Sequence, residues 1–119
     1  MTLSDFIIFL SDQSLVNSRL YFKPGRNGPY NDPETLLRNY GHWLMIFSKS
    51  FELTGKQKFL KKVREFAEYA VSKEARPYGY SFHHRFKEGK DKCNGLIGQA
   101  WTFESLACAS LILNDSKYA

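Results

Sequence analysis

The sequence predicts an all-α protein built from helical hairpins. Long segments place apolar residues three and four positions apart, which is typical of helices, and one hairpin pattern recurs after about sixty residues. The chain has 119 residues, of which 43% are hydrophobic and 24% are charged. This composition indicates a soluble globular domain and excludes collagen, low-complexity disorder and a disulfide scaffold.

The first expected helix lies at 3–15, where Ser4 is suited to cap it and the apolar residues are Phe6, Ile7, Phe9 and Leu10. The apolar run follows Asp5 rather than a basic segment, is too short to cross a membrane, and has no small-residue cleavage site nearby. We therefore expect no signal peptide and no membrane span, and a cytoplasmic protein if Met1 is the true start.

The second expected helix begins after Asp32 and ends near Leu53. Asp32 can cap the free amides, Pro33 suits the first helical position, and Glu34 favours the positive end of the helix dipole. Thr54-Gly55 then stops the helix. The apolar residues with helical spacing are Leu36, Leu37, Tyr40, Trp43, Leu44, Phe47 and Phe51.

The third expected helix is amphipathic, because lysines and glutamates fill one side and apolar residues the other. Its apolar positions are Phe59, Leu60, Val63, Phe66, Ala67, Ala70 and Val71. We interpret the lysines as a solvated face, because the net charge of +5 comes from scattered residues rather than one stripe. A nucleic-acid partner is therefore not expected.

The segment 74–94 is expected to be a long aromatic loop, and alternating residues within it predict a short β-hairpin at 76–92. The last helix, Gly95–Leu113, has Glu104 as its one charged residue, so we expect burial on nearly every side. Cys93 and Cys108 lack metal-ligand spacing and are expected to be reduced thiols.

An internal repeat organises these elements. Residues 51–60 are echoed by 111–119: each is the end of an inner helix, a tight polar turn and a lysine-aromatic start to the next helix. We divide the chain into an N-terminal helix at 1–20, a first hairpin with its loop at 21–73, and a second hairpin at 74–119 that is truncated. The whole chain is interpreted as one partial domain, a piece of a longer protein.

This pattern resembles the (α/α)6 toroid of the six-hairpin glycosidase-like superfamily. The stretch FELTGKQKFLKKVREFAEYA resembles its recurrent hairpin turn, and NGLIGQAWTFESLACAS resembles its glycine-glutamine-alanine-tryptophan inner helix. The resemblance covers roughly 21–119, and six hairpins would need about three times this length. It implies a carbohydrate-active protein acting on a poly- or oligosaccharide. The superfamily includes glycoside hydrolases, uronide hydrolases, polysaccharide lyases and sugar epimerases, so the fold does not specify the reaction.

In such a toroid, the N-terminal ends of the inner helices and the loops before them face the central cleft. The corresponding loops here are 21–30 and 76–85. Aromatic faces stack on sugar rings, and Arg, Asn and His donate to hydroxyls and carboxylates. The alternative is that the aromatics plug the end of the bundle. The candidate substrate-binding residues are Arg26, Tyr30, His42, Tyr78, Tyr80, Arg85, Asn94, Gln99 and Trp101.

Glu104 is the candidate general acid or base. Burial of a lone carboxylate on an apolar helix would raise its pKa into a range useful for proton transfer. The alternative is a structural ion pair with Arg38 or Arg85. Glycoside hydrolysis uses two carboxylates, and Asp91 or Asp32 is the candidate second one.

His83 and His84 are candidate helpers in catalysis, with ordinary hydrogen bonding as the alternative. In an extended segment their side chains point to opposite faces, and no third residue has diagnostic ligand spacing, so no metal site is expected. The sequence contains no phosphate loop, dinucleotide-binding fingerprint or nucleophile elbow, and no cofactor is expected.

The alternative function is a non-catalytic module, either a saccharide binder or a helical protein-interaction domain. Without the remaining hairpins, the apolar sides of Trp43, Phe47 and Leu106 need cover. The expected partners are therefore a saccharide and either the remainder of a longer chain or a second copy, with no membrane.

Overall fold

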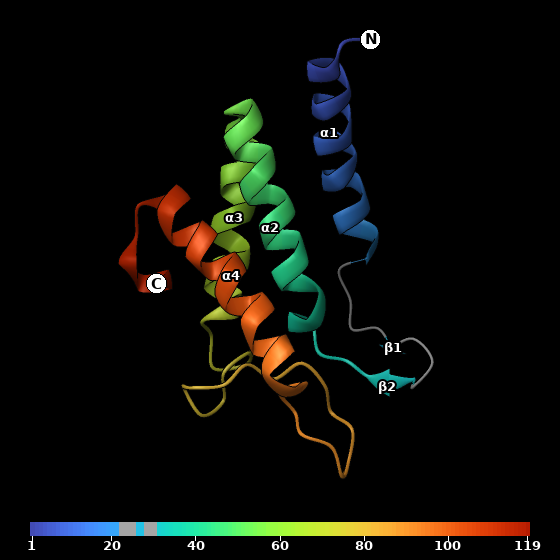
Figure 1. Cartoon of the computed structure of the whole chain (residues 1–119), viewed down its shortest axis with the longest axis vertical. Helices are drawn as coiled ribbons and strands as arrows, with labels where there is room; N and C mark the ends of the chain where they lie inside the picture. The colour runs from blue at the N-terminus through green and yellow to red at the C-terminus, as the bar shows by residue number, and fades with distance from the viewer. Residues whose placement is uncertain (22–25, 28–30) are drawn as a thin grey trace.

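The computed structural model describes residues 1–21, 26–27 and 31–119, and it confirms the all-α class (Figure 1). The helices of this part of the chain are α1 (Leu3–Tyr21), α2 (Leu37–Thr54), α3 (Gln57–Ala70) and α4 (Gly95–Leu113). A 3-10 turn, η2 (Ser116–Tyr118), follows α4. Two short strands, β1 (Arg26–Asn27) and β2 (Asp32–Pro33), pair in antiparallel register before α2.

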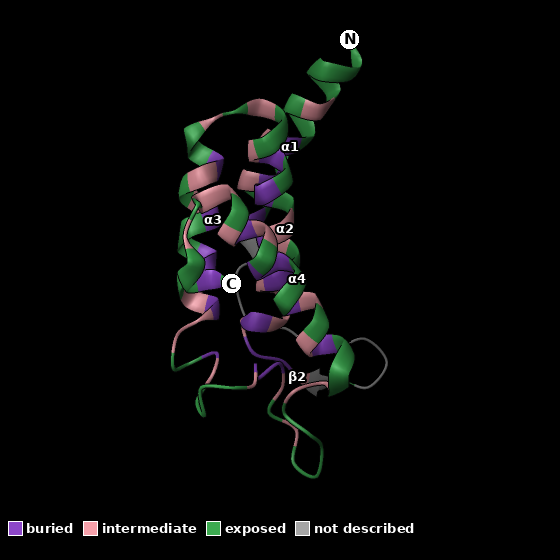
Figure 2. Cartoon of the chain, turned by 60° about the vertical axis from the view of Figure 1, so that its left-hand side comes forward, coloured by how far each residue is buried: buried purple, intermediate pink, exposed green. Residues whose placement is uncertain are grey.

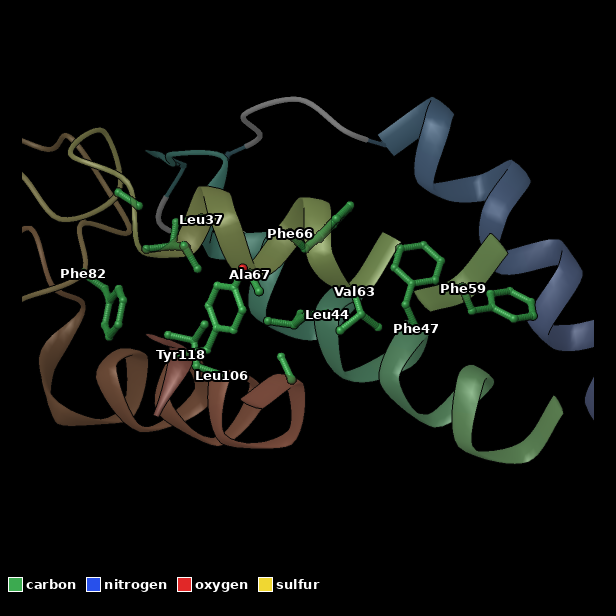
Figure 3. Close-up of a cluster of buried hydrophobic side chains, with 13 residues drawn as sticks. Leu37, Leu44, Phe47, Phe59, Val63, Phe66, Ala67, Phe82, Leu106 and Tyr118 are labelled. Atoms are coloured by element: carbon green, nitrogen blue, oxygen red, sulfur yellow. The ribbon is translucent and has the colours of Figure 1, made fainter. Parts of the chain in front are cut away.

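Helix α2 is central to the packing, because it contacts α1, α3 and α4, and α3 also contacts α4. The core lies where α2, α3 and α4 meet (Figure 3). Phe66 stacks on Tyr40 with ring centroids 4.4 Å apart and meets Phe47 edge-on at 5.4 Å. The fully buried core side chains include Leu37, Leu44, Phe47, Phe59, Val63, Phe66 and Phe82.

The two inner helices end in the same way, as the sequence repeat suggests. Gly55 closes α2 with a left-handed φ of 63°, and Asn114 closes α4 with a left-handed φ of 49°. The aromatic residue that follows each turn, Phe59 or Tyr118, is buried. Tyr118 is the last residue of the 3-10 turn η2, which follows Asn114 and Asp115.

The predicted start of α2 is wrong. Asp32 and Pro33 lie in β2, and the helix begins at Leu37 without a side-chain cap. The reason is that this segment pairs with the loop before α4: Phe86 donates its backbone N–H to the Pro33 carbonyl over 2.9 Å, and Thr35 donates to the His84 carbonyl over 3.0 Å. These bonds hold the segment extended past the expected cap.

The predicted β-hairpin at 76–92 is also wrong, because no strand forms there. Arg85 instead forms an isolated bridge with Glu34, outside the loop. His84 and Arg85 both donate to the Lys92 carbonyl, which closes the loop without a ladder. The loop therefore bonds to the segment before α2 at Arg85 and to itself at Lys92, without forming a strand.

Helix α4 is not buried on nearly every side, contrary to expectation. It packs one face through Gly98, Thr102, Ser105, Leu106 and Ala109, and no described element covers the other (Figure 2). The exposed side chains there are Leu96, Ile97, Phe103 and Leu111, at 89, 57, 55 and 83% exposure.

The length and composition of α4, among the described helices, are sufficient to cross a membrane. Core helices of soluble proteins share these two properties. The cytoplasmic location and the absence of a membrane partner therefore stay predictions.

A second uncovered apolar region lies between α1 and α2. An open groove of about 340 Å³ runs between them, and its apolar lining is Ile7, Leu10, Met45, Ile46 and Leu53. Phe47 and Leu106, which were expected to need cover, are buried in the core, whereas Trp43 is partly buried. The apolar surface that needs cover therefore lies on α1 and on the outer face of α4.

The packing of α4 generates a stability prediction for Gly98. A Cβ there would lie 2.5 Å from the Cys93 carbonyl oxygen, whereas a Cβ at Gly41 would meet nothing nearer than 3.5 Å. We expect Gly98→Ala to destabilise the fold by about 1–3 kcal/mol despite the better helix propensity of alanine. Gly41→Ala is the control and should be within about 1 kcal/mol of wild type. Urea unfolding followed by circular dichroism measures both, and equal stability of the two variants would contradict the prediction.

Candidate functional site

The N-terminal ends of α2 and α4 and the loop 76–94 lie at the same end of the bundle (Figure 1). Thr35, just before α2, joins them, because its hydroxyl donates to the His83 carbonyl over 2.6 Å and its N–H donates to the His84 carbonyl. The starts of α2 and α4 and the second loop therefore lie together, and the role of this end in binding a saccharide stays a prediction.

A group of polar and aromatic side chains gathers where α2 and α4 meet. We call Arg38, His42, His84, Trp101 and Thr102 the Trp101 cluster. The His42 and Trp101 ring centroids are 5.2 Å apart, and the Arg38 guanidinium carbon lies 5.6 Å from the Trp101 ring centroid. His42 is exposed and Trp101 is half-buried, so the cluster reaches the surface.

The position of the cluster follows from local sequence. Arg38 and His42 are four residues apart on α2, and this spacing puts them on one face of the helix. Between them, Gly41 lies against the backbone of α4: a Cβ there would be 3.7 Å from the Trp101 carbonyl oxygen. The backbone of α4 at Trp101 therefore lies against α2 between Arg38 and His42.

His84 is the buried member of the cluster, with 2% exposure. Its Nε2 lies 3.1 Å from the Thr102 hydroxyl oxygen, and that hydroxyl donates to the Gly98 carbonyl over 3.2 Å. The tautomer of the ring sets which of Nε2 and the hydroxyl donates to the other. Nδ1 has no hydrogen-bond partner among the described residues.

Burial, and second the positive charge of Arg38, lower the pKa of His84 from 6.5 to about 4. His84 is therefore neutral at neutral pH. A base with so low a pKa takes up a proton only weakly at neutral pH. His84 is therefore better suited to holding its neighbours in position than to proton transfer.

His83 faces a different neighbour. Its ring meets Tyr78 edge-on with centroids 5.6 Å apart, and burial, with a smaller effect of Lys92, lowers its pKa. The side chains of His83 and His84 therefore contact different neighbours, as we expected for two adjacent residues of an extended segment. Tyr78 and Tyr80 stack on one another at 6.1 Å and are 64 and 76% exposed, so they form an open aromatic surface rather than a plug.

Asp91 is a structural carboxylate. It accepts hydrogen bonds from the Gly95 backbone N–H over 2.8 Å and from the Arg85 guanidinium over 2.6 Å. The Gly95 bond, followed by the Arg85 contact, lowers the pKa of Asp91. It therefore remains ionised at the start of α4, beside Asn94, which occupies the cap position without a side-chain cap bond.

Gln99 holds the loop onto α4. Its carbonyl oxygen accepts from the Phe82 N–H over 2.8 Å, and its amide nitrogen donates to the carbonyls of Phe82 and Cys93 over 2.9 and 3.1 Å. Oxygen and nitrogen are both engaged with backbone, so Gln99 is a structural residue in this conformation.

The prediction that Glu104 is a buried carboxylate is wrong, because this residue lies on the exposed face of α4. The expected ion pairs do not form either: Arg38 pairs with Glu34 over 3.2 Å, and Arg85 pairs with Asp91. Desolvation therefore cannot activate this carboxylate in the described structure, and its catalytic role stays a prediction.

Some predicted residues lie outside the described structure, namely Tyr30 and the side chains of Arg26 and Asp32. Among the described residues, no group of three or more His, Cys, Asp or Glu could hold a metal ion. Arg38 and Thr102 were not among the predicted site residues, although each lies near one: Arg38 lies one turn before His42, and Thr102 follows Trp101.

Comparison with known proteins gives one relevant similarity. The chain is 48% identical over 95 residues to the archaeal glycosylation protein Q of Haloferax volcanii. The match covers 80% of this chain and 26% of that protein, so the chain spans about a quarter of the relative's length. No protein-family profile and no solved structure matches the chain.

The lowered pKa of His84 predicts acid sensitivity of the fold. The folded-state pKa of about 4 lies below the ordinary 6.5, so the unfolded state binds the proton more tightly. The contribution of His84 to the free energy of unfolding should be fully present above pH 6.5. It should fall as the pH drops toward 4, by up to about 1.4 kcal/mol per pH unit. Unfolding by urea at several pH values measures this slope.

His84→Gln should reduce the slope between pH 6.5 and 4. The control is His42→Gln, which leaves the burial of His84, the largest cause of its shift, in place. If His84→Gln and wild type show the same slope in this window, the assignment of a neutral buried His84 is incorrect.

Proposed function

We propose that this chain is part of a carbohydrate-active (α/α) toroid and that its Trp101 cluster binds a saccharide. The observation that carries the proposal is the half-buried indole of Trp101, flanked by Arg38 and His42 at the N-terminal ends of the two inner helices. Such an aromatic face beside polar donors suits the C–H face and hydroxyls of a sugar ring.

The relative supports a carbohydrate-related role. Its name assigns it to glycosylation, and it is 48% identical to this chain over the matched residues. The role is therefore proposed as part of glycan assembly or processing rather than as general polysaccharide degradation. The relative is about four times as long as the matched segment, which supports a unit within a larger ring.

Further helical hairpins would complete that ring. The groove between α1 and α2 and the outer face of α4 are both apolar and uncovered among the described residues. Amphipathic helices at these edges would bury them, supplied by the remainder of a longer chain or by a second copy.

A non-catalytic saccharide-binding module is the second candidate. It is favoured by the state of the acids near the cluster: Glu34 is paired with Arg38, and Asp91 is paired with Arg85. Glycoside hydrolysis would need two free carboxylates facing one bond. Under the enzyme hypothesis, these come from Glu104 together with a residue beyond the described segment.

Saccharide binding is tested by Trp101→Ala. Loss of the stacking surface should weaken binding of D-glucose and D-glucuronate at least tenfold, measured by NMR titration. Phe103→Ala is the matched control, because Phe103 is an exposed aromatic on the same helix, and it should bind as wild type does. The proposal fails if neither sugar binds wild type or if the two variants behave alike.

Catalysis is tested separately by Glu104→Gln. If Glu104 is the acid or base, this variant should lose at least about 100-fold in kcat on 4-nitrophenyl glycosides while its sugar affinity stays within twofold of wild type. Glu88→Gln, an exposed carboxylate in the loop, is the control. Turnover that is unchanged in Glu104→Gln, or absent from wild type, would instead support the binding module.

A further inference from the structure

We propose that the Trp101 cluster selects a saccharide that carries an oxyanion, either a carboxylate or a phosphate, and that Arg38 binds this group. The inference rests on the proposed function and names its ligand class more narrowly. The sequence predicts Arg38 only as a possible ion-pair partner of Glu104. The anion-binding role of Arg38 is inferred from the geometry of the structure.

The first argument is the unused hydrogen-bonding capacity of Arg38. A guanidinium carries five N–H donors, and here the Nε edge faces Glu34 with a 3.2 Å contact. No described residue accepts a hydrogen bond from the two terminal nitrogens of Arg38. These nitrogens are the pair of donors that binds a carboxylate or phosphate with two parallel bonds.

The second argument is that Arg38 is already immobilised beside the proposed sugar platform. Its side chain is 18% exposed, and its guanidinium carbon lies 5.6 Å from the Trp101 ring centroid. Contacts with Glu34 and the indole therefore hold the guanidinium in place before a ligand arrives, which reduces the entropy lost on binding. A sugar stacked against Trp101 would place a ring substituent within reach of the guanidinium.

The third argument concerns charge. Arg38 contributes, after burial, to the lowered pKa of the neighbouring His84, as a positive charge beside an imidazole does. Another acid at this end of the bundle, Asp91, is paired with Arg85. An anion bound to Arg38 would therefore meet one paired carboxylate, Glu34, and no free one among the described residues.

The experiment compares three probes: D-glucuronate, glucose 1-phosphate and D-glucose. Binding to the folded chain is measured by NMR titration or calorimetry at low and high NaCl. Wild type should bind at least one anionic probe at least tenfold more tightly than glucose. This preference should shrink at high salt because added ions screen the charge on Arg38.

Arg38→Gln should lose the preference, so that its affinities for the anionic probes and for glucose differ by less than twofold. Arg38→Lys retains the charge but not the paired donors, so it should retain only part of the preference. Arg64→Gln is the charge-matched control, because Arg64 is exposed on α3, and it should retain the full preference. Circular dichroism verifies that each variant folds. If Arg38→Gln does not fold, the preference of Arg38→Lys for the anionic probes decides whether Arg38 binds the anion.

The outcomes separate the two proposals. Preference for glucuronate alone assigns a carboxylate, preference for glucose 1-phosphate alone assigns a phosphate, and both support oxyanion recognition. If all three probes bind equally, or if Arg38 variants keep the preference, anion recognition is wrong and saccharide binding stands. If none binds, both proposals fail.

Discussion

The packing of α4 depends on the absence of a side chain at Gly98. The Cys93 carbonyl and the His84 ring occupy the space where a Cβ would lie, at 2.5 and 3.3 Å. This contact brings the loop against the helix. The backbone of α4 around Trp101 also lies against Gly41 of α2, but at distances that a Cβ would tolerate. The missing side chain at Gly98 therefore determines how near the polar loop comes to α4.

Much of the fold could be predicted from local pattern. The α2–α3 hairpin has long apolar periodicity and a glycine that adopts the left-handed cap, so the end of α2 and the turn into α3 were predicted correctly. The start of α2 was misplaced because Asp32 and Pro33 satisfy every local rule for a helix start. The competing partner, the backbone at Phe86, is far away in sequence and leaves no local signal.

The candidate site was only partly predictable, because contacts between separate elements determine which side chains gather there. His42 and Trp101 were named correctly as members of one region, because the order of inner helices places them at one end. Arg38 was missed as a site residue because a charge next to a helix start is ordinarily a surface feature. Glu104 was misjudged because an apolar composition predicts burial only when a neighbouring element supplies the other surface, and none of the described elements packs on that face of α4.

The bond between the Thr35 hydroxyl and the His83 carbonyl joins residues 48 positions apart. The α2–α3 hairpin, by contrast, is closed by the Gly55 N–H bond to Phe51. Loop closure over a long separation costs more chain entropy than a local turn does. We therefore expect the hairpin to form early as a local unit during folding, and the contact between Thr35 and the loop 76–94 to form later.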